Sequence, residues 1–295
     1  MNDKIKAGVI GYTEDGNFAK KTLSPRIHNY WLKKYGINGE YKAYNIQPDN
    51  LEEFIISLPK QNMTGCNVTL PHKENILKIE NIKLTSSTKN IGAVNTIFIE
   101  NGVICGDNTD WIGFWNNVVH SLYNKQNKKA IILGAGGAAK GVIYALFQGG
   151  FTEIIVTNRT KSRAEELVSY VTPHLLRGLE IKIADWNDRN EILKDCDLLV
   201  NTTSLGMVGQ PELDIDLSLL PKEAVVTDIV YNPLETKLLK AALLRGNQVV
   251  DGLGMLLYQA VPGFKAWFDP DGLILKKNEP EVTEDLRQYV LEGLK

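Results

Sequence analysis

The stretch Ile131-Ile-Leu-Gly-Ala-Gly-Gly-Ala-Ala139 joins an apolar run to a glycine-rich turn near the middle of the 295-residue chain. Gly134, Gly136 and Ala139 match the G-x-G-x-x-G/A spacing of dinucleotide-binding turns. The first glycine turns the chain, the second lets backbone approach a pyrophosphate, and the small third residue permits close helix packing. A following helix N-terminus would add free N–H groups and a positive dipole end. Because an ordinary strand-to-helix turn can look the same, the neighbouring segments must decide.

The segment after the next expected strand favours NADP over NAD. In NAD-binding proteins an acidic residue about 20 positions beyond the glycine turn binds the ribose 2′-hydroxyl. Here Thr157-Asn158-Arg159-Thr160 contains no carboxylate, and Lys161 and Arg163 follow in the expected first helical turn. The helix dipole disfavours cations there. A bound 2′-phosphate would neutralise them, and a guanidinium binds phosphate oxygens bidentately. The alternative is a solvated basic helix end.

Composition excludes several classes of protein. The chain is 43% hydrophobic, and 33 Lys and Arg against 35 Asp and Glu give a net charge of -2, which disfavours a general nucleic-acid or anionic-membrane binder. No window reaches the roughly 18 apolar residues of a membrane span, and the N-terminus does not resemble a secretory signal. The three cysteines are widely spaced, which predicts buried reduced thiols and neither a disulfide framework nor a metal site. We therefore expect a cytoplasmic enzyme without a metal.

The order of expected elements predicts an α/β fold with two parts. Strands are expected in the first half at residues 7–10, 41–46, 64–68, 94–99 and 102–106, with helices near 48–57 and 71–80. A further helix is expected to begin with Ser24 as its N-cap and Pro25 as its first residue. Strands in the second half are expected at 130–133, 152–157, 179–183, 197–200, 224–228 and 247–250, separated by helices, as in a doubly wound parallel sheet.

These patterns predict three segments. Residues 1–123 form a substrate-binding catalytic domain of α/β class, and 124–252 form a Rossmann-type NADP-binding domain. The polar stretch Asn124 to Lys129 marks the boundary between them. Residues 253–295 form a helical segment in which the apolar run Gly254 to Phe268 packs back on the first domain. The helix after Thr160 is expected to bury one face through Ala164, Leu167, Val168 and Val171.

Polar residues at expected strand ends of the first domain suggest a site for a polyhydroxylated substrate. They occur in Asn67-Val-Thr-Leu-Pro-His-Lys73, Gly92-Ala-Val-Asn-Thr96 and Asp107-Asn-Thr-Asp110. Such a site pairs each substrate hydroxyl with a donor or acceptor and rejects analogues that lack the group. His72 is an alternative acid beside Lys73, because its unperturbed pKa lies near neutrality. The strand ends at Asn201 and Asp228 are compatible with either ligand contacts or capping loops.

With these motifs in place, the chain resembles the NADP-dependent shikimate dehydrogenases of the shikimate/quinate dehydrogenase family. The resemblance spans nearly the whole chain. It rests on nine motifs in the family's order: Leu23-Ser-Pro-x-Ile-His-Asn29, Asn67-Val-Thr-x-Pro-x-Lys73, Gly92-Ala-Val-Asn-Thr96, Asp107-Asn-Thr-Asp110, Gly134-Ala-Gly-Gly-Ala138, Asn158-Arg-Thr160, Asn201-Thr-Thr-Ser-x-Gly-Met207, Asp228-x-x-Tyr231 and Asp251-Gly-x-x-Met255 with Gln259.

The resemblance implies reversible reduction of 3-dehydroshikimate by NADPH in aromatic amino-acid (chorismate) biosynthesis. It makes Lys73 the catalytic acid/base, paired with Asp110. The residues implied to hold substrate hydroxyls are Thr69, Asn95, Asp110 and Gln259, and those implied to face the substrate carboxylate are Thr22, Ser24 and Tyr231. The residues implied to bind the cofactor are Gly134, Ala135, Gly136, Gly137, Ala138, Asn158, Arg159, Thr160, Arg163, Ile229 and Gly252. Of these, Ile229 and Gly252 are implied to line the nicotinamide side.

The chain departs from the family pattern in one region. Thr22 stands where the family usually has serine, and the segment Tyr12 to Lys21 is about five residues longer than the usual turn. Two alternatives for the function stay open: broader use of quinate or NAD, and a non-catalytic sensor, which the retained Lys73 and Asp110 disfavour. The sequence also leaves open whether the protein is a monomer or a homodimer.

Overall fold

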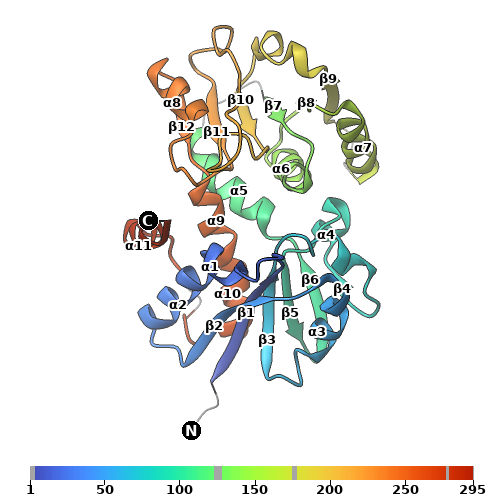
Figure 1. The fold of residues 1–295 in the computed structure, drawn as a ribbon, viewed down its shortest axis with the longest axis vertical. Coiled ribbons are helices and arrows are strands. Elements are labelled where there is room, and N and C mark those ends of the chain that lie inside the picture. Colours follow the sequence, from blue (N-terminus) through green and yellow to red (C-terminus); the bar gives the residue numbers. More distant parts are fainter. Residues whose placement is uncertain (1–3, 123–127, 175–177, 277–278, 295) are drawn as a thin grey trace. The chain divides into compact units, whose positions relative to one another are not determined.

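The computed structural model describes residues 4–122, 128–174, 178–276 and 279–294. The chain divides into two compact units, Met1–Thr109 with Gln259–Lys295, and Asp110–Tyr258, so that both ends of the chain belong to the first unit (Figure 1). These divisions differ from the boundaries expected after residues 123 and 252, because helices α5 (Asp110–Val118) and α9 (Leu253–Tyr258) pack on each other within the second unit. The functional domain boundaries stay predictions, and residues 124–127 of the expected bridge lie outside the described residues.

The first unit contains a mixed sheet with the strand order β2-β1-β3-β5-β6-β4. Its strands are β1 (Ile5–Gly11), β2 (Gly39–Asn45), β3 (Met63–Val68), β4 (Lys83–Leu84), β5 (Thr96–Glu100) and β6 (Val103–Asp107). Strand β1 runs parallel to β2 and β3, whereas β5 is antiparallel to β3 and β6. The five strands predicted from the sequence in this half are confirmed.

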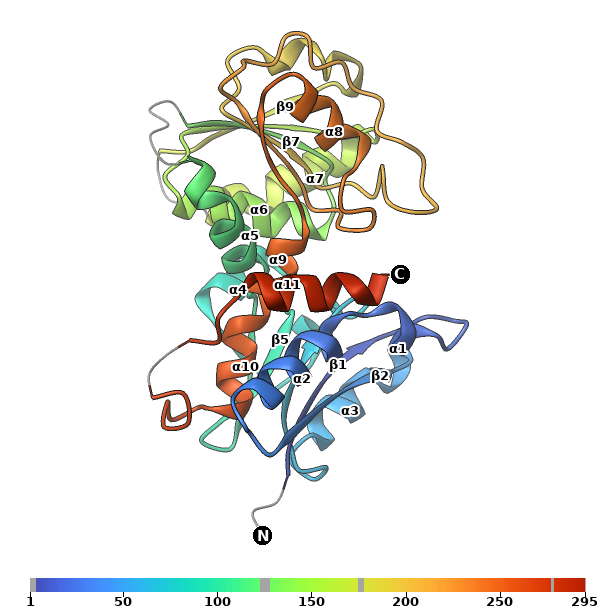
Figure 2. The same ribbon diagram turned by 90° about the vertical axis from the view of Figure 1, so that its left-hand side faces the viewer.

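Helices cover both faces of this sheet. They are α1 (Phe18–Lys21), α2 (Ser24–Lys34), α3 (Leu51–Ser57), α4 (Ser86–Ile91), α10 (Ala260–Phe268) and α11 (Glu284–Leu291), with 3-10 turns η1 (Pro48–Asn50), η2 (Asn75–Lys78) and η7 (Glu292–Leu294). Helix α3 and turn η2 pack an apolar core on one face. Helix α10 packs on β1, β3 and β5 and beside α2, while α11 lies along α2 (Figure 2). The predicted return of the C-terminal segment is therefore confirmed for α10 and α11, whereas α9, which begins the expected apolar run, belongs to the second unit.

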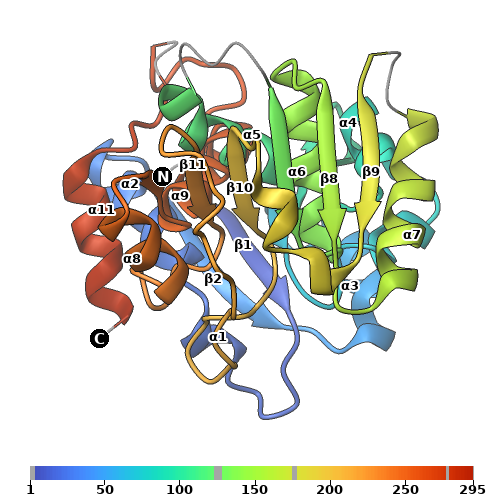
Figure 3. The same ribbon diagram turned by 90° about the horizontal axis from the view of Figure 1, so that it is seen from above.

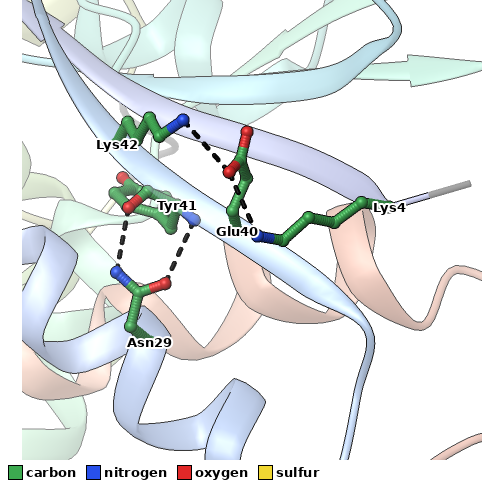
Figure 4. A network of polar contacts seen from close by, with 5 residues as sticks. All are labelled: Lys4, Asn29, Glu40, Tyr41 and Lys42. Carbon is green, nitrogen blue, oxygen red and sulfur yellow. Dashed lines mark hydrogen bonds and ion pairs between the residues drawn. The ribbon is translucent and has the colours of Figure 1, made fainter.

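A side chain from α2 pairs with the edge strand of the first sheet (Figure 4). The Asn29 Nδ2 group donates to the Tyr41 carbonyl oxygen at 2.9 Å, and the Tyr41 N–H donates to Asn29 Oδ1 at 3.1 Å. Glu40 accepts charged contacts from Lys4 at 3.2 Å and from Lys42 at 3.1 Å. These contacts satisfy part of an otherwise open sheet edge. They also fix α2 against β2.

The second unit contains a parallel sheet with the strand order β12-β11-β10-β7-β8-β9. Its strands are β7 (Lys129–Leu133), β8 (Glu153–Thr157), β9 (Glu180–Ala184), β10 (Leu198–Asn201), β11 (Val225–Asp228) and β12 (Gln248–Val250). Numbered from β7, this is the 3-2-1-4-5-6 order of a Rossmann fold. All six strands predicted in this half are confirmed, and so is the doubly wound sheet.

The second unit buries its inner strands β7, β8, β10 and β11 under helices and loops on both faces, whereas the edge strands β9 and β12 contain no buried residue. Its helices are α5 and α9, given above, with α6 (Gly137–Gln148), α7 (Lys161–Val171), α8 (Lys237–Leu244) and the 3-10 turns η3 (Val119–Leu122), η4 (Thr172–His174), η5 (Trp186–Asp188) and η6 (Glu191–Leu193). Helices α5, α6 and α7 share a core with one face, as α6 beside β8 and α7 beside β9 illustrate (Figure 3). Helix α8 and the segment before β11 cover the other. In α7, Ala164, Leu167 and Val171 are buried and Val168 is half-buried, as predicted.

Two local predictions were wrong. No α-helix spans 71–80, because the Lys73 carbonyl accepts the Val94 N–H at 2.8 Å and is not available to a helical N–H four residues on. Lys73 therefore lies in a turn before η2. Ser24 is the first residue of α2 and not its N-cap, which is Leu23. The Thr22 hydroxyl instead accepts the Ser24 N–H at 3.3 Å.

Candidate active site

The glycine turn after β7 has the geometry of a backbone cradle. Gly134 adopts φ +109°, and a Cβ atom there would lie 2.8 Å from both Thr202 Oγ1 and Thr203 Cγ2. Its N–H donates to the Thr157 carbonyl at 2.8 Å, which ties the turn to the end of β8. Only glycine combines this dihedral with so close a neighbour. The first residue of the motif is thus required by the fold itself.

The next two glycines face open space. Gly136 is the N-cap of the twelve-residue helix α6 and offers no capping side chain, and in the described part of the chain no atom beyond the local backbone lies within 4 Å of the Cβ position of Gly136 or Gly137. Behind them Ala139 is fully buried against the sheet. The first N–H groups of a helix have no partner within the helix, so this end can receive an anion. These residues fit a dinucleotide pyrophosphate.

Asn158 joins the glycine turn to the basic segment. Its Oδ1 accepts the Ala135 N–H at 3.2 Å, and its Nδ2 donates to the Thr160 carbonyl at 2.8 Å. Thr160 is the N-cap of α7, and Lys161 and Arg163 lie in the first turn of that helix, as predicted. Lys161 pairs with Glu165 at 4.0 Å, whereas Arg159 and Arg163 are exposed and form no ion pair within the described part of the chain. Both guanidinium groups are available to a phosphate.

The strand ends at Asn201 and Asp228 are internal supports of the second unit. Asn201 Nδ2 donates to Asp228 Oδ1 at 3.0 Å, and Asn201 Oδ1 accepts the Thr203 N–H at 3.0 Å. Asp228 also accepts the Val230 N–H at 3.0 Å and the Thr236 hydroxyl at 2.8 Å. Burial raises the pKa of Asp228 to about 6. The sequence left open either ligand contacts or capping loops at these strand ends. The hydrogen bonds of Asn201 and Asp228 match capping loops.

Ile229, Tyr231 and Gly252 lie in the loops after β11 and β12. A Cβ atom on Gly252 would lie 2.4 Å from the Ile229 carbonyl oxygen, so these two backbones approach closely and only glycine fits. Tyr231 is half-buried, and burial raises the pKa of its phenol. The structure therefore brings Ile229 and Gly252 together. Their proposed contact with a nicotinamide stays a prediction.

A buried network of amides and hydroxyls lies in the first unit, centred on Asn95. Asn95 Oδ1 accepts the Thr109 N–H at 2.7 Å, and its Nδ2 donates to Thr109 Oγ1 at 3.0 Å and to Gln259 Oε1 at 3.4 Å. Thr109 Oγ1 in turn donates to the Gln259 carbonyl at 2.8 Å. Asn95 and Gln259, predicted from separate motifs, are thus adjacent. Thr109 and Gln259 are also the residues at which the chain leaves and re-enters this unit.

Two members of this network were missed from the sequence as site residues. Asn67 Nδ2 donates to the Asn95 carbonyl at 3.2 Å and to Thr96 Oγ1 at 3.3 Å, and its Oδ1 accepts the Tyr41 hydroxyl at 2.6 Å. Thr109 holds Asn95 as described above. Asn67 stands between Cys66 and Val68 in the buried part of strand β3, and a polar residue at such a position was the available signal. Buried amides of this kind need partners, which fixes their orientation.

Lys73 is half-buried and lies close to the network along the backbone. Its carbonyl accepts the Val94 N–H, the residue before Asn95. The turn that carries it begins at Thr69, whose N–H donates to the Ile10 carbonyl at 2.9 Å and whose carbonyl accepts the His72 N–H at 2.9 Å. Non-local backbone bonds therefore hold Lys73 and Thr69 at the ends of the sheet strands. This placement suits a side chain that must meet a reacting atom.

Thr22 and Ser24 form a pair of hydroxyls at the start of α2. Thr22 Oγ1 lies 3.4 Å from Ser24 Oγ, and Ser24 is 8% exposed. Asp110 is the first residue of α5 and belongs to the second unit, where its carboxylate lies in the first helical turn and suits the helix dipole. The polar residues predicted in the first half are thus divided, with Lys73, Thr69, Asn95, Thr22 and Ser24 in one unit and Asp110 in the other.

The two histidines of this unit, the candidate acid His72 and His28, pack inside it. His72 is fully buried, its Nε2 lies 2.8 Å from the Ile46 carbonyl oxygen, and burial lowers its pKa. His28 stacks on Tyr41 at 4.1 Å between ring centroids, and burial lowers its pKa to about 3. A buried imidazole of this kind resists protonation. His72 is therefore a poor candidate for the acid.

The described residues hold no cluster of three metal-ligating side chains, and none of their helices has the length and apolar character to cross a bilayer. All three cysteines are free and buried. A Rossmann sheet with an open glycine turn and a basic helix start, joined to a unit with a buried polar network, defines the class of dinucleotide-dependent oxidoreductases that act on polar small molecules.

Comparison with known proteins specifies the family. Residues 16–97 match the shikimate dehydrogenase substrate binding domain, and residues 117–209 match the shikimate / quinate 5-dehydrogenase model. A shikimate dehydrogenase (NADP(+)) of Paramagnetospirillum magneticum is 43% identical over 99% of this chain and 100% of its own length. The chain belongs to the shikimate dehydrogenase family.

Solved structures agree with this assignment. A shikimate dehydrogenase in complex with NADP+ superimposes with a TM-score of 0.85 at 32% identity, covering 99% of this chain and 96% of the other. The quinate dehydrogenase of Corynebacterium glutamicum in complex with NAD also gives a TM-score of 0.85, at 29% identity, covering 99% and 100% of the two chains. The fold therefore does not by itself choose between substrates or cofactors.

Proposed function

We propose that this chain catalyses the reversible NADPH-dependent reduction of 3-dehydroshikimate to shikimate in aromatic amino-acid biosynthesis. The observation that carries the proposal is the buried network that holds the Asn95 and Gln259 amides together near the Lys73 backbone. The full-length similarity to a shikimate dehydrogenase (NADP(+)) supports it. A ring with several hydroxyl groups needs fixed donors and acceptors of this kind.

The network supports a role in orienting the substrate. Because Asn95 Oδ1 is held by Thr109, and Asn67 is held by Tyr41, the amide orientations are set before any ligand binds. We assign the contacts with substrate hydroxyls to Thr69, Asn95, Asp110 and Gln259. The contacts with the carboxylate belong to Thr22, Ser24 and Tyr231. A preorganised site of this kind reduces the cost of fixing the substrate for reaction.

Lys73 and Asp110 are assigned the proton transfer. When NADPH is bound, its nicotinamide supplies the hydride that converts the ketone carbon to an alcohol carbon. Negative charge then develops on the substrate oxygen, and the Lys73 ammonium both stabilises this charge and donates the proton that completes the hydroxyl. In the reverse direction the neutral amine accepts that proton. The half-buried position of Lys73 restricts competing water.

The cofactor is assigned to the glycine turn and to the basic start of α7. Gly134, Ala135, Gly136, Gly137 and Ala138 would hold the pyrophosphate through backbone N–H groups. Asn158, Arg159, Thr160 and Arg163 would bind the ribose 2′-phosphate, while Ile229 and Gly252 would line the nicotinamide. The exposed guanidinium groups of Arg159 and Arg163, which lack a carboxylate partner among the described residues, support NADP over NAD. Broader use of quinate or NAD is the alternative for the same site.

The direct test supplies the purified chain with 3-dehydroshikimate and NADPH. We expect NADPH absorbance to fall and shikimate to appear in equal amount by chromatography, and we expect the reaction to reverse with shikimate and NADP. A heat-denatured sample is the control for uncatalysed change. If NADPH is not consumed, or if the product is not shikimate, the proposed function is wrong.

A further inference from the structure

Residues 12–22, which follow β1, contribute a single buried side chain. Of residues 12–22, which the structure describes throughout, only Phe18 is buried, with 6% of its surface exposed. The family resemblance described above implies that residues 12–21 form a longer segment than the usual turn. An added surface loop does not need a buried aromatic residue, because loops tolerate insertion through exposed polar residues. Phe18 therefore indicates that the extra residues pack against something specific.

Hydrogen bonds fix the shape of this segment. The Thr13 N–H donates to Asn45 Oδ1 at 2.9 Å, and Asn45 Nδ2 donates back to the Thr13 carbonyl at 3.3 Å, so the segment is tied to the end of β2. Asp15 accepts the Asn17 N–H at 3.0 Å and pairs with Lys21 at 2.7 Å. Helix α1, which carries Phe18, packs on β2 (Figure 2). The segment is an ordered part of the first unit.

The Phe18 ring lies against Gly11 together with the Thr69 methyl group. A Cβ atom on Gly11 would be 2.5 Å from Phe18 Cε2 and 2.7 Å from Thr69 Cγ2. Both side chains thus occupy the same side of Gly11, where the absence of a side chain makes room for the ring. Thr69 is one of the residues assigned to a substrate hydroxyl. Removal of the ring would leave a cavity beside it.

The same residue is connected to the hydroxyl pair at the start of α2. The Phe18 carbonyl accepts the Thr22 N–H at 3.2 Å, which makes Thr22 the C-cap of α1. Thr22 Oγ1 contacts Ser24 Oγ and accepts the Ser24 N–H. Phe18 therefore begins the short helix α1, whose C-cap is Thr22, and the Phe18 ring lies beside Gly11 on the same side as the Thr69 methyl group. The hydroxyls of Thr22 and Thr69 are assigned to different parts of the substrate.

We propose that Phe18 is a positioning residue that determines substrate specificity by fixing Thr22 relative to Thr69, an inference that rests on the proposed function. Shikimate has a planar, unsaturated ring carbon bearing its carboxylate, whereas in quinate that carbon is tetrahedral and bears an additional hydroxyl. The quinate end of the molecule is therefore thicker. A rigid spacing of the two threonines selects the thinner ring, because a preformed site rejects a group that it has no room to accommodate.

The test uses three full-length variants: Phe18→Ala removes the ring, Phe18→Leu retains most of its bulk, and Phe54→Ala is the matched control. Phe54 is a half-buried aromatic residue of α3 in the same unit, where it packs on Tyr44. Steady-state rates are measured with shikimate and with quinate at saturating NADP, together with the KM for NADP and the melting temperature.

We expect Phe18→Ala to raise the KM for shikimate about tenfold while kcat changes by less than about twofold, since the ring acts on binding geometry and not on proton transfer. The ratio of kcat/KM for shikimate to that for quinate falls by about tenfold, because the spacing of Thr22 and Thr69 is no longer fixed. Phe18→Leu, which keeps part of the bulk but not the ring, lowers the ratio only partially, by about threefold. Phe54→Ala lowers the melting temperature but leaves the ratio and the KM for NADP unchanged.

An unchanged substrate ratio in Phe18→Ala, or an equal change in Phe54→Ala, overturns the proposal. If Phe18→Ala does not fold, Phe18→Leu decides: a partial fall in the ratio supports the proposal, and the wild-type ratio contradicts it. Failure of the proposed function is a separate result, because the unaltered protein would then not oxidise shikimate at all.

Discussion

The two units provide for their ligands with different parts of the chain. In the second unit the groups suited to binding are mainly backbone N–H groups, exposed because Gly136 and Gly137 have no side chains to cover them. In the first unit they are side-chain amides and hydroxyls such as Asn95 and Gln259, each held by a buried partner. The backbone site of the second unit depends on where the chain turns. The side-chain site of the first unit depends on which side chains meet.

This difference has consequences for evolution and for mutation. A backbone site tolerates change in most side chains, because its donors are present in every residue and only the glycines are essential. A side-chain network loses function when any one member is replaced, because its partner is left unsatisfied in a buried position. Substrate specificity is therefore expected to be sensitive to substitution in the first unit, and cofactor choice to the few basic residues at the start of α7.

The largest effect is expected at the residue of the first unit that is assigned to chemistry. Lys73→Ala should lower kcat by about 10²- to 10⁴-fold, because it removes the proton donor and the charge that stabilises the developing oxyanion. The dissociation constant for NADP, measured by fluorescence titration, should not change. Lys78→Ala, in turn η2, is the control and should keep full activity. Near-normal turnover of Lys73→Ala would remove this residue from the mechanism.

The buried His28 makes the stability of the first unit sensitive to acid. Burial lowers the pKa of His28 from 6.5 to about 3, so below pH 6.5 the unfolded chain takes up a proton that the folded chain refuses. Stability from this residue is present above pH 6.5 and is lost as the pH falls towards 3. At about 1.36 kcal/mol per pH unit, the loss by pH 4 is about 3 kcal/mol.

The measurement compares the wild type with His28→Phe, which keeps an aromatic ring beside Tyr41. Free energies of unfolding are obtained by urea titration at pH 7 and pH 4. The wild type should lose about 3 kcal/mol more than the variant between these values. Equal losses in the two proteins would show that His28 is not the source of acid sensitivity.

Asp228 gives the second unit the opposite dependence on pH. Burial raises its pKa from 3.8 to about 6, so the folded state holds this proton more tightly than the unfolded state does. The contribution of Asp228 to stability is complete below pH 3.8 and is lost as the pH rises through 6, a change of about 2 to 3 kcal/mol. Asp228→Asn should therefore gain stability relative to the wild type between pH 4 and pH 7 in urea titrations. A constant difference across this range would contradict the assignment.

The smallest effect is expected at the basic start of α7. Arg159→Ala should raise the KM for NADP about tenfold and leave the KM for NAD nearly unchanged, because only NADP carries the 2′-phosphate. Lys161→Ala is the matched control, since this lysine already pairs with Glu165 and should affect NADP less. If Arg159→Ala weakens both cofactors equally, this residue does not bind the 2′-phosphate.

The same contrast explains how much could be predicted from sequence. The six strands of the second unit were all found, because the inner strands are short apolar runs covered on both faces and the edge strand β9 alternates charged and apolar residues between turns. The glycine turn was found for a similar reason: its geometry is specified by residues that are neighbours in the chain. Local information was sufficient there.

Prediction failed where non-local contacts decide the structure. The helix expected at 71–80 does not form, because the Lys73 carbonyl bonds to Val94, a residue of a distant segment. The N-cap role expected for Ser24 fails because the helix begins one residue earlier than expected, with Leu23 as its N-cap, and the Ser24 N–H donates to the Thr22 hydroxyl. Asn67 and Thr109 stood in motifs read from the sequence but were given no role there, since only the fold brings them to Asn95. A pattern in one segment cannot specify a partner in another.

We infer that the site selects shikimate and NADP. Four steady-state measurements test this selectivity most directly. The purified chain is assayed with shikimate and with quinate, each with NADP and with NAD. We predict that kcat/KM is highest for shikimate with NADP and falls when either component is exchanged. A higher kcat/KM for quinate with NAD would contradict both the substrate and the cofactor assignment.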